Sequence, residues 1–137
     1  MKVVLFACVE NSFRSQIAEA YFNKFAPKGW TAVSAGVKPA EKVHPNAVLL
    51  MREEGIDISG KKPQPLSVEL QTKAEIAVIV CGSAECPLVY SRYIENWNVA
   101  DPAKMSLEEA RKIRDLIKDR VLTLIQKIKE PNFPFHA

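Results

Sequence analysis

The chain has 137 residues, of which 47% are hydrophobic and 26% are charged. This composition is typical of a compact domain with a sizeable core, so we expect residues 1–137 to form one domain. A net charge of +3 is too small and too dispersed to predict a nucleic-acid partner. The longest apolar run, Val3 to Val9, is much shorter than the roughly 20 residues of a membrane span, and no small-residue cleavage pattern follows it. We therefore expect a cytoplasmic protein without a membrane partner.

Hydrophobic spacing alternates along the chain between short apolar runs, which predict strands, and stripes at spacings of three and four, which predict helices. The expected elements are, in chain order, a strand at Val3 to Ala7, a helix at Ser15 to Phe25, a strand at Trp30 to Ser34, a helix at Pro45 to Glu54, a short helix around Ser67 to Lys73, a strand at Ile76 to Val80, a weaker strand at Glu95 to Val99 and a helix from Leu107 to about Lys129. The last helix begins with a capping box of Ser106 and Glu109. Its charged stretch, Glu108 to Arg120, predicts a solvated helix face.

This order of elements predicts the fold class. Strands that alternate with helices pair in parallel through right-handed crossovers. We therefore expect an α/β fold with a doubly wound, four-stranded parallel sheet and helices on both faces. Such sheets bind ligands at the carboxyl ends of their strands, where the strand order reverses.

A loop of phosphate size lies where the first strand is expected to end and the first helix to begin. Cys8 opens the loop, and Arg14 and Ser15 close it. The intervening residues are enough to wrap a tetrahedral oxyanion with backbone N–H groups, while the helix N-terminus and the planar fork of Arg14 attract negative charge. The predicted binding residues are Val9, Glu10, Asn11, Ser12, Phe13, Arg14 and Ser15.

The same loop predicts the chemistry of Cys8. A thiol pKa near about 8.5 falls to roughly 3.5–7.5 at a helix N-terminus beside an arginine. We therefore expect Cys8 to be a thiolate nucleophile, with Ser15 donating a hydrogen bond to it. The alternative is a buried cysteine at a strand end and an unrelated surface arginine. Three cysteines, an odd number, favour reactive thiols over a static disulfide framework.

The chain resembles the low molecular weight protein tyrosine phosphatase family and, within it, the thioredoxin-coupled arsenate reductases. The matching segments are CVENSFRSQIAE at residues 8–19, Ser34-Ala35-Gly36, Ile56 to Ser59, the segment with Cys81 and Cys86, and Asp101-Pro102. The resemblance implies that Cys8 is the nucleophile, that Arg14 and the loop amides bind the oxyanion, and that Asp101 is the general acid.

Cys81 and Cys86 separate the two activities that this resemblance implies. A phosphatase hydrolyses its thiophosphate with water, whereas an arsenate reductase needs further thiols to carry away two electrons as a disulfide. If the strands before Cys8 and Cys81 are neighbours, their backbones lie about 4.8 Å apart, within the roughly 4.4–6.8 Å Cα window of a disulfide. We expect Cys81 to attack Cys8 and Cys86 to attack Cys81, with thioredoxin as the final reductant. The alternative for both residues is a small apolar role in the core.

Several residues bear on whether the protein binds metal cations, and one bears on oxyanion binding. Some relatives bind potassium through residues that map to Asn11, Glu19 and Ser34, but the remaining acidic position falls near Gln64, which argues against that site. Glu19 is alternatively a solvated carboxylate near a helix start. We expect no metal and no cofactor, because the cysteines and the two histidines, His44 and His136, lack the spacing of a zinc site. Within the loop, Glu10 repels an oxyanion unless its side chain turns outward.

The predicted function is thus arsenate reduction by Cys8, Cys81 and Cys86. One alternative is hydrolysis of phosphotyrosine or of small phosphate esters through the same loop, with Asp101 as the acid. The other is a module that binds oxyanions or senses redox state without catalysis.

Overall fold

The computed structural model describes residues 1–82, 86–87, 89–131 and 133. His136, part of the tail at Phe133 to Phe135 and residues 83–85, which join Cys81 to Cys86 in the chain, lie outside the described residues. The elements are β1 (Lys2–Cys8), α1 (Arg14–Phe25), β2 (Trp30–Gly36), α2 (Pro45–Arg52), α3 (Val68–Lys73), β3 (Ile76–Ile79), β4 (Ile94–Asn96) and α4 (Leu107–Ile128). Every predicted element is therefore present.

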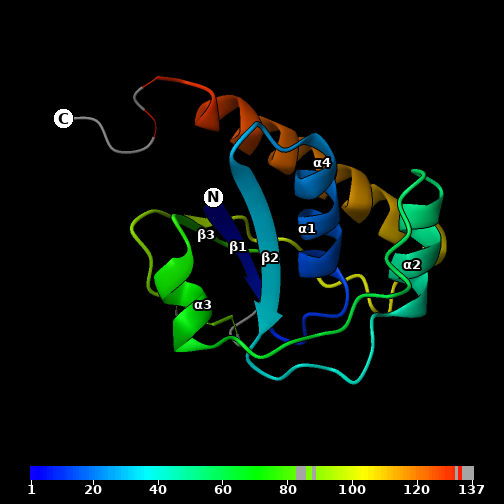
Figure 1. The fold of residues 1–137 in the computed structure, drawn as a ribbon. Helices are drawn as coiled ribbons and strands as arrows, with labels where there is room; N and C mark the ends of the chain where they lie inside the picture. The colour runs from blue at the N-terminus through cyan, green and yellow to red at the C-terminus, as the bar shows by residue number, and fades with distance from the viewer. Residues whose placement is uncertain (83–85, 88, 132, 134–137) are drawn as a thin grey trace.

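The four strands form one parallel sheet in the order β2-β1-β3-β4. Helices α1 and α4 cover one face, and α3 lies on the other (Figure 1). This arrangement confirms the predicted doubly wound α/β fold. From β1 the chain passes first to β2, on one side of β1, and later to β3, on its other side. The strand order therefore reverses between β1 and β3. The loop after β1 lies at this point, where such sheets bind ligands.

Burial of β1 on both faces explains its unbroken apolar sequence. Val4 and Phe6 pack into the core under α1 and α4, whereas Leu5 and Ala7 pack into a second core toward α3. Alternation of side chains along a strand produces this division. The resulting core fixes the register of β1 and, with it, the position of Cys8 at the carboxyl end of the sheet.

The predicted boundaries differ from the observed ones by one to three residues, and two of the differences coincide with local turns. The strand expected at Glu95 to Val99 is β4, which ends at Asn96 because Asn98 takes a left-handed backbone with φ of 50°. Helix α2 ends at Arg52 and not at Glu54, and Gly55 follows with φ of 74°. Both corrections reflect local turns that apolar spacing does not report. The capping box at the start of α4 is confirmed.

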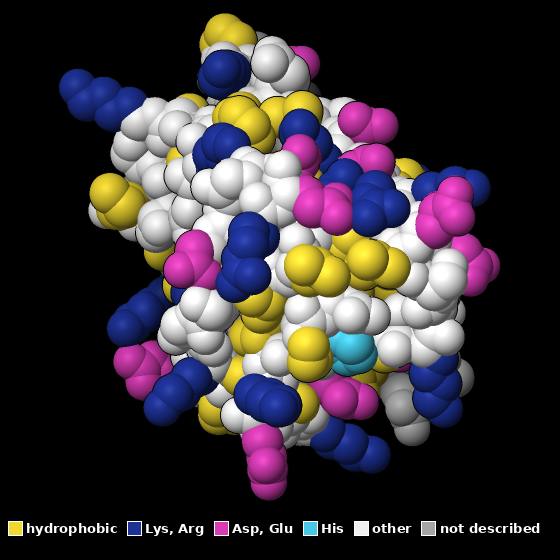
Figure 2. All heavy atoms as spheres, turned by 90° about the vertical axis from the view of Figure 1, so that its right-hand side faces the viewer, with side chains coloured by type: hydrophobic (Ala, Val, Ile, Leu, Met, Phe, Trp, Pro, Cys, Tyr) yellow, Lys and Arg dark blue, Asp and Glu magenta, His cyan; other side chains and the backbone are white. Residues whose placement is uncertain are grey.

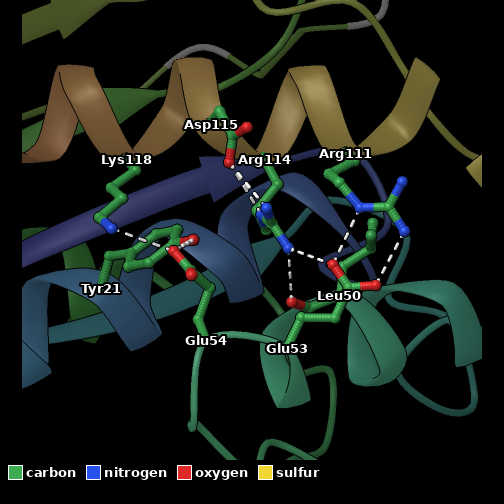
Figure 3. Close-up of polar contacts among 8 residues, drawn as sticks. All are labelled: Tyr21, Leu50, Glu53, Glu54, Arg111, Arg114, Asp115 and Lys118. Carbon is green, nitrogen blue, oxygen red and sulfur yellow. Dashed lines mark hydrogen bonds and ion pairs between the residues drawn. The ribbon is translucent and has the colours of Figure 1, made fainter. Parts of the chain in front are cut away.

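The charged stretch of α4 is not wholly solvated, which corrects the sequence interpretation. Arg114 is buried and donates to the carbonyl oxygen of Leu50 (2.9 Å) and to carboxylate oxygens of Glu53 (2.8 Å) and Asp115 (2.9 and 3.0 Å). Arg111 binds the same Glu53 carboxylate through two nitrogens (Figure 3). These contacts fasten α4 to the end of α2.

Charges of both signs are intermingled on the face formed by α2 and the start of α4, around scattered apolar side chains (Figure 2). The ion pair of Arg111 with Glu53, both partly exposed, joins charges of opposite sign between α4 and α2. That face therefore has no single-sign field of the kind that attracts nucleic acid. None of the helices in the described ranges combines the length and the apolar character that crossing a membrane requires.

Candidate active site

A pocket of about 230 Å³ lies at the carboxyl end of the sheet, where β1 ends. Its lining consists of the loop residues Cys8, Val9, Glu10, Asn11, Ser12, Phe13 and Arg14, together with Gly82, Asp101 and Ala103. Of the predicted loop residues, Ser15 alone is missing from this lining. The fold thus brings together the loop, the residue after Cys81 and the predicted acid.

The carbonyl groups of the loop are held away from the pocket. Those of Val9, Glu10 and Ser12 accept hydrogen bonds of 2.8–2.9 Å from backbone N–H groups in segment 38–44. Among the described residues, no backbone or side-chain acceptor pairs with the N–H groups of residues 10–13. A run of unpaired N–H groups around a concavity is an anion-binding nest. The loop is therefore built to receive an oxyanion.

Asn11 fixes the conformation of the loop through the hydrogen bonds of its side chain. Its backbone is left-handed, with φ of 53°, and its side chain is buried. The side-chain amide donates to the hydroxyl of Ser15 (2.8 Å), and its oxygen accepts from the backbone N–H of Gln64 (2.9 Å). Ser15 was expected to donate to Cys8. Its hydroxyl accepts from Asn11 instead, and no hydrogen bond joins Ser15 to Cys8 among the described residues.

Gly36 allows β2 to approach the loop closely. A Cβ atom at this position would lie 2.6 Å from the carbonyl oxygen of Val9 and 2.8 Å from the backbone nitrogen of Asn11. Real side chains do not reach such distances without displacing their neighbours. The glycine is thus a condition for the observed loop.

Cys8 carries a free thiol that is 3% exposed. Its sulfur donates a hydrogen bond to the carbonyl oxygen of Val80 (3.2 Å). Burial raises the pKa of this thiol, and the charges of Asp101 and Glu10 add to the rise, while Arg14 and the N–H of Val9 oppose it. The expectation of a lowered pKa is therefore wrong for this state, because desolvation of the thiolate outweighs its attraction to Arg14.

Arg14 forms the wall of the pocket beside Cys8. One terminal nitrogen donates to the carbonyl oxygen of Val99 (2.8 Å), and the other lies 4.0 Å from a carboxylate oxygen of Asp101. Its Nε atom is buried and has no partner among the described residues. A buried donor without an acceptor is costly. Arg14 therefore offers a hydrogen bond that a bound oxyanion would satisfy.

The predicted residues Glu10, Phe13 and Asp101 also line the pocket. Asp101 has 61% of its side chain exposed and accepts a hydrogen bond from the N–H of Ala103 (3.0 Å). Glu10 is exposed, which is the outward orientation that leaves the backbone N–H groups available. Phe13 is buried, and its ring packs 5.0 Å from that of His44. Asp101 is thus placed where a proton donor can reach both ligand and solvent.

Cys81 and Cys86 form a disulfide, with their Cα atoms 5.7 Å apart. Cys81 is buried and Cys86 is half-buried, and both pack in the apolar cluster that contains Cys8. Strands β1 and β3 are neighbours, as the relay requires. The structure therefore holds an oxidised pair beside a reduced nucleophile.

The family model of low molecular weight phosphotyrosine protein phosphatases matches residues 3–132. The chain belongs to this family. A protein of Synechocystis named glutaredoxin arsenate reductase is 38% identical over 131 residues, which cover 93% of this chain and 99% of that protein. A structure described as an arsenate reductase in the phosphate-binding state is 34% identical, with a TM-score of 0.81, over 94% of this chain and 100% of the other. The structure of a thioredoxin-dependent arsenate reductase from Corynebacterium glutamicum is 28% identical, with a TM-score of 0.78, over 94% of this chain and 62% of that one.

The sequence analysis missed one buried polar cluster, which contains Glu19. Glu19 is buried and not solvated; its carboxylate accepts from the hydroxyl of Ser34 (2.6 Å) and forms an ion pair with Lys61. Nothing in the sequence distinguishes Lys61 from Lys62. In the described parts of the chain, no group of three histidine, cysteine or acidic side chains could hold a metal ion.

Proposed function

We propose that this protein reduces arsenate to arsenite through Cys8, Cys81 and Cys86. The observation that carries the proposal is the Cys81–Cys86 disulfide at the sheet edge that also holds the oxyanion pocket. A phosphatase that hydrolyses its intermediate with water has no use for this pair. The arsenate reductases among the relatives support the proposal.

The first step forms a sulfur–arsenic bond. Arsenate binds the N–H groups of residues 10–13 and the guanidinium of Arg14. Burial raises the pKa of Cys8 in the disulfide-bonded state. In our proposal the thiol also carries its proton when arsenate arrives, so the dianion meets a neutral group. The dianion accepts this proton, the thiolate attacks arsenic, and an oxygen leaves as water after Asp101 supplies a second proton.

The next two steps carry the electrons away. The Cys81 thiolate attacks the sulfur of Cys8, and the sulfur–arsenic bond breaks. The electron pair of that bond stays on arsenic, which leaves as arsenite, and a Cys8–Cys81 disulfide forms. Cys86 then attacks Cys81 and releases Cys8, which gives the pairing seen here.

The final reductant is thioredoxin in this proposal. A dithiol protein must attack one sulfur of the Cys81–Cys86 bond, and Cys86 is the more exposed of the two. Attack there releases Cys81 as a thiolate and forms a transient mixed disulfide. One relative is named for glutaredoxin and another for thioredoxin. The test therefore compares these two reductants directly.

The test is arsenate turnover with thioredoxin, thioredoxin reductase and NADPH, compared with glutaredoxin and glutathione. We expect NADPH consumption that depends on arsenate and is lost in Cys8→Ser, Cys81→Ser and Cys86→Ser. Phosphate binding by the last two variants is the control for an intact loop. Turnover that survives both Cys81→Ser and Cys86→Ser would contradict the relay, and faster reduction by glutaredoxin would contradict the choice of thioredoxin.

A second candidate is hydrolysis of phosphate monoesters, which the position of Asp101 in the pocket of Cys8 and Arg14 favours. A leaving alkoxide or phenolate needs a proton, and an exposed carboxyl at the pocket mouth can supply one. The same variants separate the two activities. If arsenate is not reduced and an aryl phosphate is hydrolysed equally well by wild type, Cys81→Ser and Cys86→Ser, hydrolysis is the function.

A further inference from the structure

We propose that the ammonium group of Lys61 is a built-in cation that positions the oxyanion loop, and that the protein consequently needs no potassium there. The proposal rests on oxyanion binding at the loop, which is one part of the proposed function. It does not depend on whether the bound oxyanion is reduced.

The first observation is a buried carboxylate with one cationic partner among the described residues. The side chain of Glu19 is 6% exposed, whereas that of Lys61 is 47% exposed. One carboxylate oxygen pairs with the Lys61 ammonium, and the other accepts from the hydroxyl of Ser34. A buried charge is stable only when it is paired and hydrogen-bonded. Lys61 reaches in from the surface to meet this requirement.

The second observation is a chain of hydrogen bonds from this ion pair to the loop. The carbonyl oxygen of Ser34 accepts from the side-chain amide of Gln64 (2.9 Å). The backbone N–H of Gln64 donates to the side chain of Asn11 (2.9 Å), which is the left-handed residue of the loop. Lys61 and Gln64 belong to one short segment. Its attachment to Glu19 therefore also places the group that holds Asn11.

The third observation concerns potassium itself. A bound metal cation requires several oxygen atoms that are free to ligate it. Here the Asn11 side-chain oxygen already accepts from Gln64 (2.9 Å) and Gln16 (3.3 Å), and both oxygens of Glu19 are engaged. Gln64 also contributes an N–H donor near the would-be ligands. These residues do not fit potassium, and the ammonium takes the place of the cation.

The experiment compares Lys61→Met, Lys61→Arg and the neighbouring control Lys62→Met. The control removes the same charge from an exposed lysine of the same segment. Methionine keeps most of the aliphatic stem, so Lys61→Met tests the charge and not the packing. The readouts are inorganic phosphate affinity by calorimetry and the melting temperature, each in potassium, sodium and choline chloride at equal ionic strength.

We expect wild type to give the same values in all three salts. Lys61→Met should bind phosphate about tenfold more weakly and melt about 4 °C lower or more, whereas Lys61→Arg and Lys62→Met stay near wild type. The double variant Glu19→Gln/Lys61→Met should recover part of the lost melting temperature, because it no longer buries an unpaired charge.

Two results would overturn the inference. One is a specific gain of phosphate affinity or stability by wild type in potassium, and the other is equal phosphate binding by Lys61→Met and Lys62→Met. Failure of wild type to bind phosphate at all would instead contradict the proposed function. The outcomes of the two proposals are therefore distinguishable.

Discussion

The thiol of Cys8 donates a hydrogen bond to the carbonyl oxygen of Val80 over 3.2 Å, between the ends of two neighbouring strands. Val80 directly precedes Cys81, so this bond joins the nucleophile to the segment that carries its successor in the relay. The bond engages the proton of Cys8, and burial raises the pKa of the thiol. In this state the nucleophile is protected.

Protection of Cys8 should be visible in its alkylation kinetics. With the Cys81–Cys86 bond intact, we expect iodoacetamide to modify Cys8 more slowly than free cysteine at neutral pH, because the thiolate fraction is smaller. The rate should continue to rise at pH values well above the ordinary thiol pKa of about 8.5, because the pKa of Cys8 lies higher. Mass spectrometry of the alkylated protein over a pH series measures it. A rate that is already maximal at neutral pH would show that Cys8 is a resting thiolate.

The same raised pKa has a consequence for stability. A group whose pKa is higher in the folded than in the unfolded chain stabilises the fold below its unfolded pKa and loses that contribution as pH rises through the folded value. We expect the free energy of unfolding to fall above about pH 8.5, and Cys8→Ser to lessen the fall. Urea unfolding at several alkaline pH values, with the disulfide intact, tests this. An equal fall in wild type and Cys8→Ser would assign it to other groups.

Gly36→Ala should damage the loop without touching its chemistry. The added Cβ would lie 2.6 Å from the carbonyl oxygen of Val9, so the loop must move. We expect phosphate affinity to fall by about tenfold or more and stability to fall by about 1–3 kcal/mol. Gly60→Ala is the control, because a Cβ there meets nothing within 4 Å. Equal phosphate binding by the two variants would show that the loop tolerates the shift.

The fold was predictable because its signals are local. The apolar run of β1, the Ser106–Glu109 box and the stripe of α4 each determine an element from neighbouring residues, and alternation then fixes the topology. The loop could be predicted for the same reason, since its spacing and its place after a strand are properties of one segment.

The rest of the site depends on residues that are distant in sequence. The hydrogen bond of Arg114 requires the end of α2 to lie beside it, and the ion pair of Glu19 requires the segment of Lys61 to lie against α1. The pKa of Cys8 was predicted with the wrong sign for the same reason. Helix and arginine effects can be estimated from sequence, but desolvation depends on the closed packing around the sulfur.

Arg14→Lys should weaken oxyanion binding although it keeps the charge. A lysine ammonium cannot donate to Val99 and, at the same time, offer a second nitrogen in the fixed plane of the Nε atom. We expect phosphate affinity to fall by about tenfold or more. Calorimetric titration measures this, with the exposed Arg120→Lys as the control. A variant that binds phosphate like wild type would show that Arg14 contributes charge alone.

Arg114→Met should loosen the attachment of α4 to α2. The change leaves the carbonyl oxygen of Leu50 and the carboxylate of Glu53 without their buried donor. We expect a loss of about 2–4 kcal/mol in the free energy of unfolding, measured with urea at neutral pH. The exposed Lys112→Met on the same helix is the control and should change stability little. Equal stability of the two variants would show that the buried hydrogen bonds of Arg114 add nothing to the free energy of unfolding.

The same variant should also change the acid stability of the protein. Hydrogen bonds from Arg111 and Arg114 lower the pKa of Glu53 to about 2. A carboxylate with a lowered pKa stabilises the fold above its unfolded value of about 4.3 and loses that contribution as pH falls through the folded value. Wild type should therefore lose stability more steeply than Arg114→Met between about pH 4.3 and 2, because the variant has less of this contribution to lose. Melting temperatures over that range measure the two slopes, and parallel slopes would show that Arg111 alone holds Glu53 ionised.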